Sequence, residues 1–425
     1  VNPSAANPWP FVCPRQVKGD DIDHLLARPA HEGPLPVGKA GENPFIVWRE
    51  RLLAHELYLA HGPEAPEARD AAFVRLVSDL DAAVAEVDGT GFRITPMEQS
   101  EAVADAIGLG GLWIKNETGN VSGSHKARHL MGLAIYIAVV EAIGWVDEVP
   151  PLAIASCGNA ALAAAVVAKA AGRPLRVFIP TDANPAVVER LESLGATIEI
   201  CEREPGVAGD PCYLRFLEAV EAGALPFCCQ GPAAGLTLEG GHLLGYEIAS
   251  QLEGKVEHLS IQVGGGALGS GLARGLAEAA DAGLLARHPR FHTVQTTGAA
   301  PLDRAWAKAR RLELAPGDAV DAARNARGAY MWPWEATPRS IAHGILDDET
   351  YDWARLVHAM LEHDGRAVVA AEGALYKARE LAAKTAGINA SYTGSAGLAG
   401  VLELMRDGVI GPNERALVIL TGVER

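Results

Sequence analysis

Lys126, a lysine in a small polar turn, is the clearest candidate for a catalytic residue in this sequence. The turn, Asn120-Val121-Ser122-Gly123-Ser124-His125-Lys126, separates a strand-like run at 112–115 from a helix-like apolar run at 130–137. A lysine at such a junction can lie in a cleft and lose hydration, which suits a Schiff-base or general-base amine. An isolated lysine is more often solvated, because charged side chains are rarely buried. Two loops further along the chain favour the chemical role.

The first of these loops is Ser156-Cys157-Gly158-Asn159-Ala160. It follows an apolar segment at 151–155 and precedes an Ala-rich segment at 161–171 that is typical of a helix. Small residues between a strand and a helix expose backbone N–H groups at the helix N-terminus, and such groups bind carboxylates. An ordinary N-cap is the alternative interpretation, because Ser and Asn are common before helices.

The second loop is Gly264-Gly265-Gly266-Ala267-Leu268-Gly269-Ser270-Gly271. It follows a strand-like segment at 259–263 and precedes an expected helix at 272–282. Successive N–H groups in such a loop bind phosphate. A dinucleotide site is disfavoured, because the next expected strand, 291–297, has no acidic residue at its end. No Gly-Lys-Ser/Thr follows the glycines, so a nucleotide-triphosphate loop is excluded.

The lysine turn, the Ser-x-Gly-Asn loop, the glycine-rich loop and a last strand that ends in Thr421-Gly422 occur in this order. The combination resembles the fold-type II pyridoxal-phosphate enzymes, which include threonine synthase, the serine and threonine dehydratases, cysteine synthase and the tryptophan synthase beta chain. The resemblance covers residues 95–425 and implies pyridoxal 5'-phosphate as cofactor. It also implies a two-domain, tryptophan synthase beta-like α/β fold. The alternation of short apolar strands and Ala-rich helices after Pro96 independently favours parallel sheets flanked by helices.

The resemblance implies a role for individual residues. Lys126 matches the lysine that forms the internal aldimine, Asn159 matches the asparagine that binds the cofactor's phenolic oxygen, and Thr421 matches the hydroxyl residue that faces its pyridine nitrogen. The substrate carboxylate is expected at the first loop: Ser156, Cys157, Gly158, Asn159 and Ala160. The cofactor phosphate is expected at the second loop: Gly264, Gly265, Gly266, Ala267 and Leu268.

The sequence departs from the family pattern at several positions. His125 stands where many dehydratases carry an aromatic residue and the tryptophan synthase beta chain carries histidine, so it is expected either to support the phosphate or to pack as a core histidine. Ala267 replaces a fourth glycine of several relatives. The segment 392–400 lacks the glutamate of the dehydratase pattern Glu-Pro-x-Gly-Ala, and Glu372 is expected to cap a helix at 374–383 rather than to contact the cofactor.

Three regions are predicted. They are an N-terminal irregular and helical extension packed on the large domain (1–95), a large cofactor-binding domain (96–130 and 235–425) and a small domain (131–234). Within the extension, helices are expected at 45–59 and 65–87, because both segments are rich in Leu, Ala, Glu and Arg.

Composition narrows the class of protein. The 425 residues carry a net charge of −16, which argues against a nucleic-acid partner. No apolar run reaches the roughly 18 residues of a membrane helix, and the first residues do not resemble a signal peptide. The six cysteines lack zinc spacing, so no metal site is expected and a reducing cytoplasm is the simple interpretation. Cys157 is expected to be a small loop residue, although a helix N-terminus can activate a thiol.

The implied chemistry begins with an amino-acid substrate whose Cα proton is removed by the Lys126 amine. Thr421 is neutral, unlike the aspartate of other pyridoxal enzymes, so the pyridine nitrogen is expected to stay unprotonated and prompt loss of a β-leaving group is favoured. A leaving hydroxide needs an acid, for which the cofactor phosphate, His125 and Lys126 are candidates.

The first functional hypothesis is therefore a lyase that eliminates the hydroxyl of a serine-, threonine- or aryl-serine-type substrate, a dehydratase or ammonia-lyase. The second is threonine synthase, whose phosphorylated substrate needs a second anion site. Arg128 and His129, near the lysine turn, are weak candidates for that site. A β-replacement synthase and a non-catalytic metabolite sensor are further alternatives, and the intact Lys126 argues against the sensor. The resemblance also suggests a homodimer or larger assembly.

Overall fold

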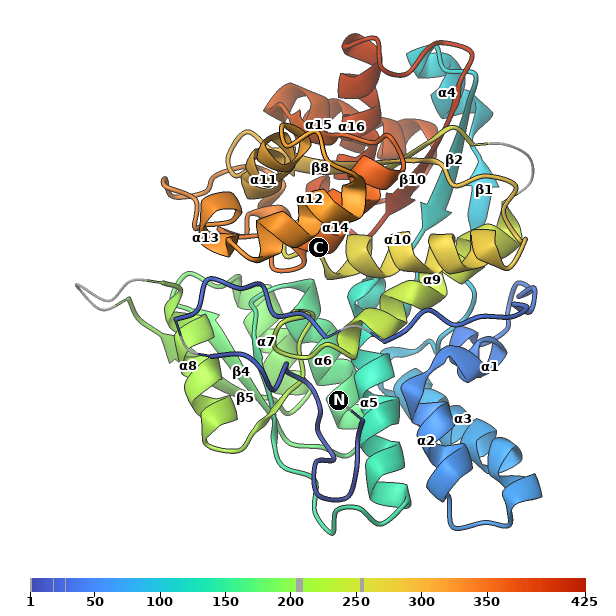
Figure 1. The fold of residues 1–425 in the computed structure, drawn as a ribbon, viewed down its shortest axis with the longest axis vertical. Coiled ribbons are helices and arrows are strands. Elements are labelled where there is room, and N and C mark those ends of the chain that lie inside the picture. The colour runs from blue at the N-terminus through green and yellow to red at the C-terminus, as the bar shows by residue number, and fades with distance from the viewer. Residues whose placement is uncertain (1, 18, 27, 204–208, 253–255) are drawn as a thin grey trace.

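The computed structural model describes residues 2–17, 19–26, 28–203, 209–252 and 256–425. Helices surround two β-sheets, one in the upper and one in the lower half of the view in Figure 1. This is the α/β architecture with parallel-rich sheets that the sequence predicts.

The larger sheet has the strand order β1-β2-β10-β7-β8-β9. In chain order its strands are β1 (Met97–Gln99), β2 (Gly111–Asn116), β7 (His258–Gln262), β8 (Arg290–Thr296), β9 (Ala367–Ala370) and β10 (Arg415–Leu420). β1 is antiparallel to β2, and the other strands pair in parallel. Because β2, β10 and β7 are neighbours, the lysine turn, Thr421 and the glycine loop that follow them lie at the same edge of the sheet.

The smaller sheet is entirely parallel and has the strand order β5-β4-β3-β6. Its strands are β3 (Leu152–Ala155), β4 (Leu175–Pro180), β5 (Thr197–Cys201) and β6 (Leu225–Pro226). The helices between them are α6 (Asn159–Ala170), α7 (Pro185–Ser193) and α8 (Pro211–Glu221). Asn184 caps α7 and Asp210 caps α8 through side-chain oxygens, so local residues set both helix starts.

Two helices join the sheets. The chain leaves the larger sheet along α5 (Lys126–Ala142) and returns along α9 (Thr237–Gln251), which packs against α5 and against α10 (Ala267–Asp281). Glycines allow this close packing, since a Cβ at Gly245 would lie 2.7 Å from Cα of Gly275. The predicted domain limits at 131 and 234 fall within α5 and just before α9, and they stay a prediction.

The N-terminal helices differ from those expected. The segment 45–59 is interrupted into α1 (Pro44–Val47), a 3-10 turn η1 (Arg49–Arg51) and α2 (Leu53–His61). Leu52 is extended, and the Arg51 side chain binds the carbonyls of Gly33 and Pro34 at the break. The second segment starts as a 3-10 turn η2 (Pro66–Ala68) and becomes α3 (Arg69–Asp88). Tertiary contacts thus override a continuous helical pattern.

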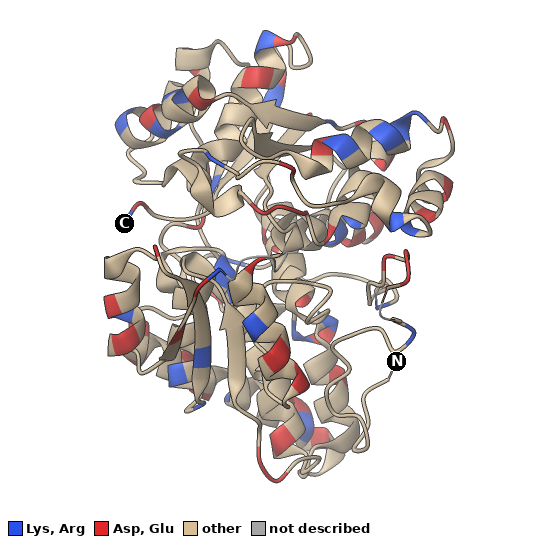
Figure 2. Ribbon diagram, turned by 90° about the vertical axis from the view of Figure 1, so that its left-hand side faces the viewer, with Lys and Arg blue, Asp and Glu red and all other residues tan. Residues whose placement is uncertain are grey.

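The remaining elements lie around the larger sheet. They are α4 (Glu101–Ile107), η3 (Val121–Gly123), α11 (Pro301–Arg310), α12 (Pro316–Arg324), α13 (Arg327–Tyr330), η4 (His343–Ile345), α14 (Trp353–Glu362), α15 (Glu372–Glu380), η5 (Leu381–Thr385) and α16 (Tyr392–Arg406). Figure 2 shows that residues of both charge signs are interspersed along the helices of both halves. Within the described ranges, every helix is too short or too polar to cross a bilayer.

Candidate active site

The lysine turn is held in a tight conformation. Lys126 is half-buried and is the first residue of α5. Before it, Ser122 and Gly123 have positive φ angles of 56° and 62°. The unusual Ser122 conformation is supported by a hydrogen bond of 2.7 Å from its N–H to Oδ2 of Asp88, at the end of α3. The N-terminal helices therefore help to fix the turn that carries the lysine.

His125 connects this turn to the end of β10. Its backbone N–H donates to the carbonyl of Thr421 at 3.0 Å, and its Nδ1 lies 3.1 Å from the same oxygen. Burial, and then the positive charge of Lys126, hold the pKa of His125 well below its usual value. The neutral ring therefore carries its proton on Nδ1, and Nε2 is left as an acceptor.

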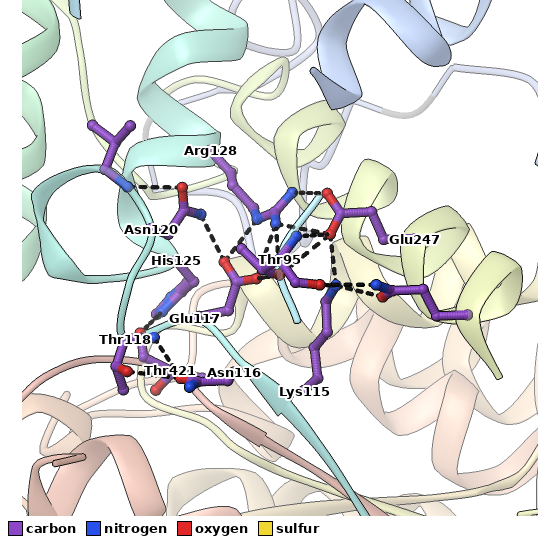
Figure 3. Close-up of polar contacts among 12 residues, drawn as sticks. Thr95, Lys115, Asn116, Glu117, Thr118, Asn120, His125, Arg128, Glu247 and Thr421 are labelled. Atoms are coloured by element: carbon purple, nitrogen blue, oxygen red, sulfur yellow. Dashed lines mark hydrogen bonds and ion pairs between the residues drawn. The ribbon is translucent and has the colours of Figure 1, made fainter. Parts of the chain in front are cut away.

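Behind the turn lies a buried ionic network that Figure 3 shows. The Arg128 guanidinium binds Glu117 at 2.8 Å and Glu247 at 2.5 Å, and Lys115 binds Glu247 at 2.7 Å. Burial alone would raise the pKa of Glu117, but the charge and hydrogen bonds of Arg128 outweigh it and hold the pKa at about 2. The network, which also includes Thr95, joins the start of α5 to β2 and α9.

The Ser-x-Gly-Asn loop lies at the end of β3 and opens α6, as predicted. Gly158 is the N-cap residue of α6. Because glycine has no side chain, it does not cap the backbone N–H groups in the first turn of α6. Asn159 reaches the C-terminal segment, because a Cβ at Gly422 would lie 2.9 Å from its Nδ2. Gly422 in turn forms a backbone bridge with Ser124. The structure thus brings the asparagine, the lysine turn and the end of β10 together.

Cys157 lies in the same loop and is exposed. Although the residue is exposed, neighbouring protein atoms partly desolvate its thiol, and this desolvation, followed by the negative charge of Asp182, raises its pKa above the ordinary value. A raised pKa lowers the thiolate fraction, which agrees with the expectation that Cys157 is a loop residue rather than a nucleophile.

The glycine loop joins β7 to α10, and α10 starts at Ala267 rather than at the expected residue 272. Gly266 has a φ of 100° and caps the helix without a side chain. A Cβ at Gly264 would clash with Oδ2 of Asp347, and one at Gly265 would lie 2.8 Å from the Tyr351 ring. The first-turn N–H groups and the helix dipole suit an anion, and larger residues in the loop would fill the space beside them.

Asp347 is a residue of this site that the sequence reasoning missed. Burial raises its pKa to about 6, although the charge of Lys126 and a hydrogen bond from the Gly265 backbone act in the opposite direction. A carboxyl group that holds a proton near neutral pH, within electrostatic reach of the lysine, is suited to acid–base chemistry. Its only sequence signal is the Asp347-Asp348 pair after the turn at Gly344.

Gln262 is the second residue that was missed. Its Nε2 donates to Oγ1 of Thr421 at 2.6 Å and to the carbonyl of Gly394 at 2.8 Å, while its Oε1 accepts from N–H of Gly397 at 3.1 Å. Thr421 and Gln262 are 2% and 5% exposed, so water does not compete for these bonds. Gln262 therefore supports the hydroxyl residue that the family resemblance singled out.

The prediction that Glu372 caps its helix is wrong. The N-cap of α15 is Ala371, and the Glu372 carboxylate instead accepts hydrogen bonds from Oγ of Ser340 at 2.5 Å and N–H of Ile341 at 3.1 Å. The Glu372 carboxylate, in the first turn of α15, therefore binds the segment 340–341, which lies outside the helix. Glu372 thus anchors the chain that leads to Asp347.

These residues fit pyridoxal phosphate. The amine of Lys126, the hydroxyl of Thr421 and the glycine loop follow three neighbouring strands of the larger sheet, and Asn159 meets them from the smaller sheet. Between them, Oγ of Ser124 is fully buried and has no hydrogen-bond partner within the described part of the chain. An orphaned buried hydroxyl beside an amine and an anion-binding loop indicates a site for a polar group.

Comparison with known proteins agrees with this geometry. The family described as "Pyridoxal-phosphate dependent enzyme" matches residues 90–422, so the chain belongs to the pyridoxal-phosphate-dependent enzymes of fold type II. Its cofactor is therefore pyridoxal phosphate.

Particular relatives and structures refine the comparison. The chain is 24% identical over 329 residues to threonine synthase of Methanosarcina acetivorans, an alignment that covers 77% of this chain and 74% of the relative. It is 29% identical over 190 residues to the serine dehydratase-like protein of Rattus norvegicus, covering 44% and 53%. The structure of processed threonine deaminase isoform 2 from Solanum lycopersicum superposes with a TM-score of 0.60 at 19% identity, covering 94% of this chain and 96% of that one. The last comparison shows the shared fold.

Proposed function

We propose that this chain is a lyase that eliminates the β-hydroxyl group of a 3-hydroxy amino acid to yield a 2-oxo acid and ammonia. The observation that carries the proposal is the hydroxyl of Thr421, a neutral group held by Gln262 where the family binds the cofactor's ring nitrogen. A neutral partner supports only modest delocalisation into the ring, which favours rapid departure of a β-substituent. The relatives named as a serine dehydratase-like protein and a threonine deaminase support the same reaction class.

Each protein group has a defined task. Pyridoxal phosphate supplies the electron sink that makes the Cα–H bond of the amino acid acidic. The Lys126 amine takes the Cα proton, and the backbone N–H groups at the start of α6 bind the substrate carboxylate. The Cβ–O bond then breaks with its electron pair on oxygen, so the oxygen leaves as water once it receives a proton. A second water molecule hydrolyses the released aminoacrylate to the 2-oxo acid and ammonia.

Asp347 is the group that we assign to protonate the leaving oxygen. His125 does not suit this task, because its pKa is well below neutrality and its Nδ1 faces the carbonyl of Thr421. Asp347 contacts the glycine loop, lies within electrostatic reach of Lys126, and has a pKa of about 6 because of burial. It thus retains a useful protonated fraction near neutral pH.

Threonine synthase is the second candidate, favoured by the similarity to the Methanosarcina enzyme over most of the chain. Its phosphorylated substrate requires a second anion site. Arg128 does not supply that site, since its guanidinium is buried among Glu117 and Glu247. His129 places Nδ1 2.6 Å from the carbonyl of Thr237, and burial lowers its pKa to about 4, so it carries no charge at neutral pH.

The proposal is tested with the purified holoenzyme and L-serine, L-threonine and an aryl-serine. Release of 2-oxo acid with one of them, absent in Lys126→Ala, is the expected result. Phosphate release from a phosphorylated homoserine, without oxo-acid formation from the three substrates, would establish the second candidate. Consumption of an added thiol or indole would reveal a replacement reaction. The homodimer stays a prediction, which light scattering can test. The cytoplasmic location also stays a prediction.

A further inference from the structure

Gln262, the last residue of β7, has a side chain whose orientation is fixed by the backbone. Its Oε1 faces N–H of Gly397 at 3.1 Å, which can only donate. Its Nε2 faces the carbonyls of Gly394 at 2.8 Å and Ile419 at 3.3 Å, which can only accept. Rotating the amide by 180° would place oxygen against oxygen and N–H against N–H. The assignment of its nitrogen and oxygen therefore follows from chemistry.

This orientation determines the role of the Thr421 hydroxyl. Because Nε2 of Gln262 lies 2.6 Å from Oγ1 of Thr421 and can only donate, the hydroxyl accepts that bond. The hydroxyl carries a single proton, and within the described residues this proton is not donated to any acceptor. The backbone of Thr421 is also fixed, since its N–H donates to Gly394 at 3.0 Å and its carbonyl accepts from His125. The free proton is thus available to a bound group.

We infer that Gln262 is a positioning residue that makes Thr421 a hydrogen-bond donor to the ring nitrogen of the cofactor. The inference rests on the proposed placement of that nitrogen beside Thr421. A hydrogen-bond donor at Thr421 favours the unprotonated ring nitrogen, because the N–H of a protonated nitrogen would point at the proton of the hydroxyl group. Without Gln262 the hydroxyl is free to turn and present a lone pair, which stabilises the protonated nitrogen instead. Gln262 would therefore keep the ring neutral through Thr421 and favour elimination.

The experiment follows the nitrogen itself. Holoenzyme is prepared with cofactor labelled with 15N at the ring position, and the 15N chemical shift is measured as a function of pH. In the unaltered protein we expect the shift of an unprotonated nitrogen throughout the neutral range. In Gln262→Met the nitrogen should titrate at higher pH, with an upfield shift at neutral pH. Gln262→Glu, a polar replacement of equal length, should show a shift in the same direction.

Ser260 provides a matched control. It lies on the same strand, is fully buried, and its Oγ donates to the carbonyl of Gly397 at 2.8 Å. Ser260→Ala removes a comparable hydrogen bond to α16 without touching Thr421, so the nitrogen shift should not change. An equal shift in Ser260→Ala and Gln262→Met would assign the effect to general loosening of the site and overturn the inference.

Thr421→Val separates failure of the inference from failure of the proposed site. A shift in Thr421→Val without one in either Gln262 variant would show that Thr421 faces the nitrogen but does not depend on Gln262. No shift in Thr421→Val would show that the cofactor nitrogen lies elsewhere. A protonated nitrogen in the unaltered protein overturns the inference without any variant. The shift reports on protonation directly, so it does not depend on turnover.

Discussion

His125 and Thr421 are joined by a backbone hydrogen bond of 3.0 Å and a second contact of 3.1 Å between Nδ1 and the same carbonyl oxygen. His125 directly precedes the lysine, and Thr421 directly follows β10. The two contacts therefore couple the position of the Lys126 amine to that of the Thr421 hydroxyl. A cofactor that contacts both Lys126 and Thr421 would therefore be held at two points by one rigid unit of protein.

Replacing Lys126 by alanine should abolish the visible absorption of the bound cofactor and lower turnover by about 10²–10⁴-fold, the usual contribution of a positioned proton-transfer group. Spectra of the reconstituted protein and an oxo-acid assay measure both effects. Lys169→Ala is the control, because Lys169 lies on the surface of α6 and its ammonium group donates to the carbonyl of Ser193, away from the lysine turn. Unchanged absorption in Lys126→Ala would contradict the assignment.

Asp347→Asn should lower turnover of L-serine by about 10²-fold while sparing β-chloroalanine, because chloride leaves without a proton. The acid must be protonated to act, so turnover of L-serine should fall as pH rises above the Asp347 pKa of about 6. The variant should lack this limb of the pH profile. Asp348→Asn, at an exposed neighbouring position, is the control. Equal losses with both substrates would indicate a role other than proton donation.

Arg128→Met should destabilise the fold by about 3–5 kcal/mol, because it leaves the buried carboxylate of Glu117 without a cationic partner and removes one of the two cations that bind Glu247. Urea unfolding measures the change. The double variant Arg128→Met/Glu117→Gln should recover part of it. Arg176→Met, which breaks a partly exposed pair with Glu199, should cost about 1 kcal/mol or less. Similar losses in Arg128→Met and Arg176→Met would contradict this account.

The same network predicts how stability depends on pH. The folded-state pKa of Glu117, about 2, lies below its ordinary value of 4.5. The stabilisation from its charged form is thus fully present above about 4.5 and is lost as pH falls toward 2. Glu117→Gln should flatten this part of the curve of unfolding free energy against pH. An unchanged slope would show that Glu117 is not the group that titrates.

Gly266→Ala should weaken cofactor binding, because alanine is strained at a φ of 100° and its Cβ would lie 3.1 Å from the Asp352 side chain. Titration of the apoprotein with pyridoxal phosphate measures the affinity. Gly373→Ala in α15 is the control, since a Cβ there meets no atom within 4 Å. It should leave affinity unchanged and raise stability by about 0.4–1 kcal/mol. Equal affinity in both variants would contradict the requirement for glycine.

The sequence by itself determined the parts of this protein that local patterns encode. Short apolar strands and capped, Ala-rich helices define the α/β class, and the lysine turn, the asparagine loop and the glycine loop each follow an expected strand. The structure has the strands and most helices within a few residues of their expected limits, but α10 starts earlier and the expected helix at 45–59 is interrupted. Local signals suffice there because both periodicity and capping arise from residues close in the chain.

Only the tertiary structure decided which distant side chains meet. Gln262 reaches Thr421 across 159 positions of sequence, and Asp347 reaches Gly264 from a turn with no helical or strand pattern. Glu372 binds Ser340 instead of capping its helix for the same reason. A side chain in a packed interior takes the partner that satisfies its hydrogen bonds after the strands have been ordered. Strand order, which places β7 beside β10, is a property of the whole chain and leaves no mark on any single segment.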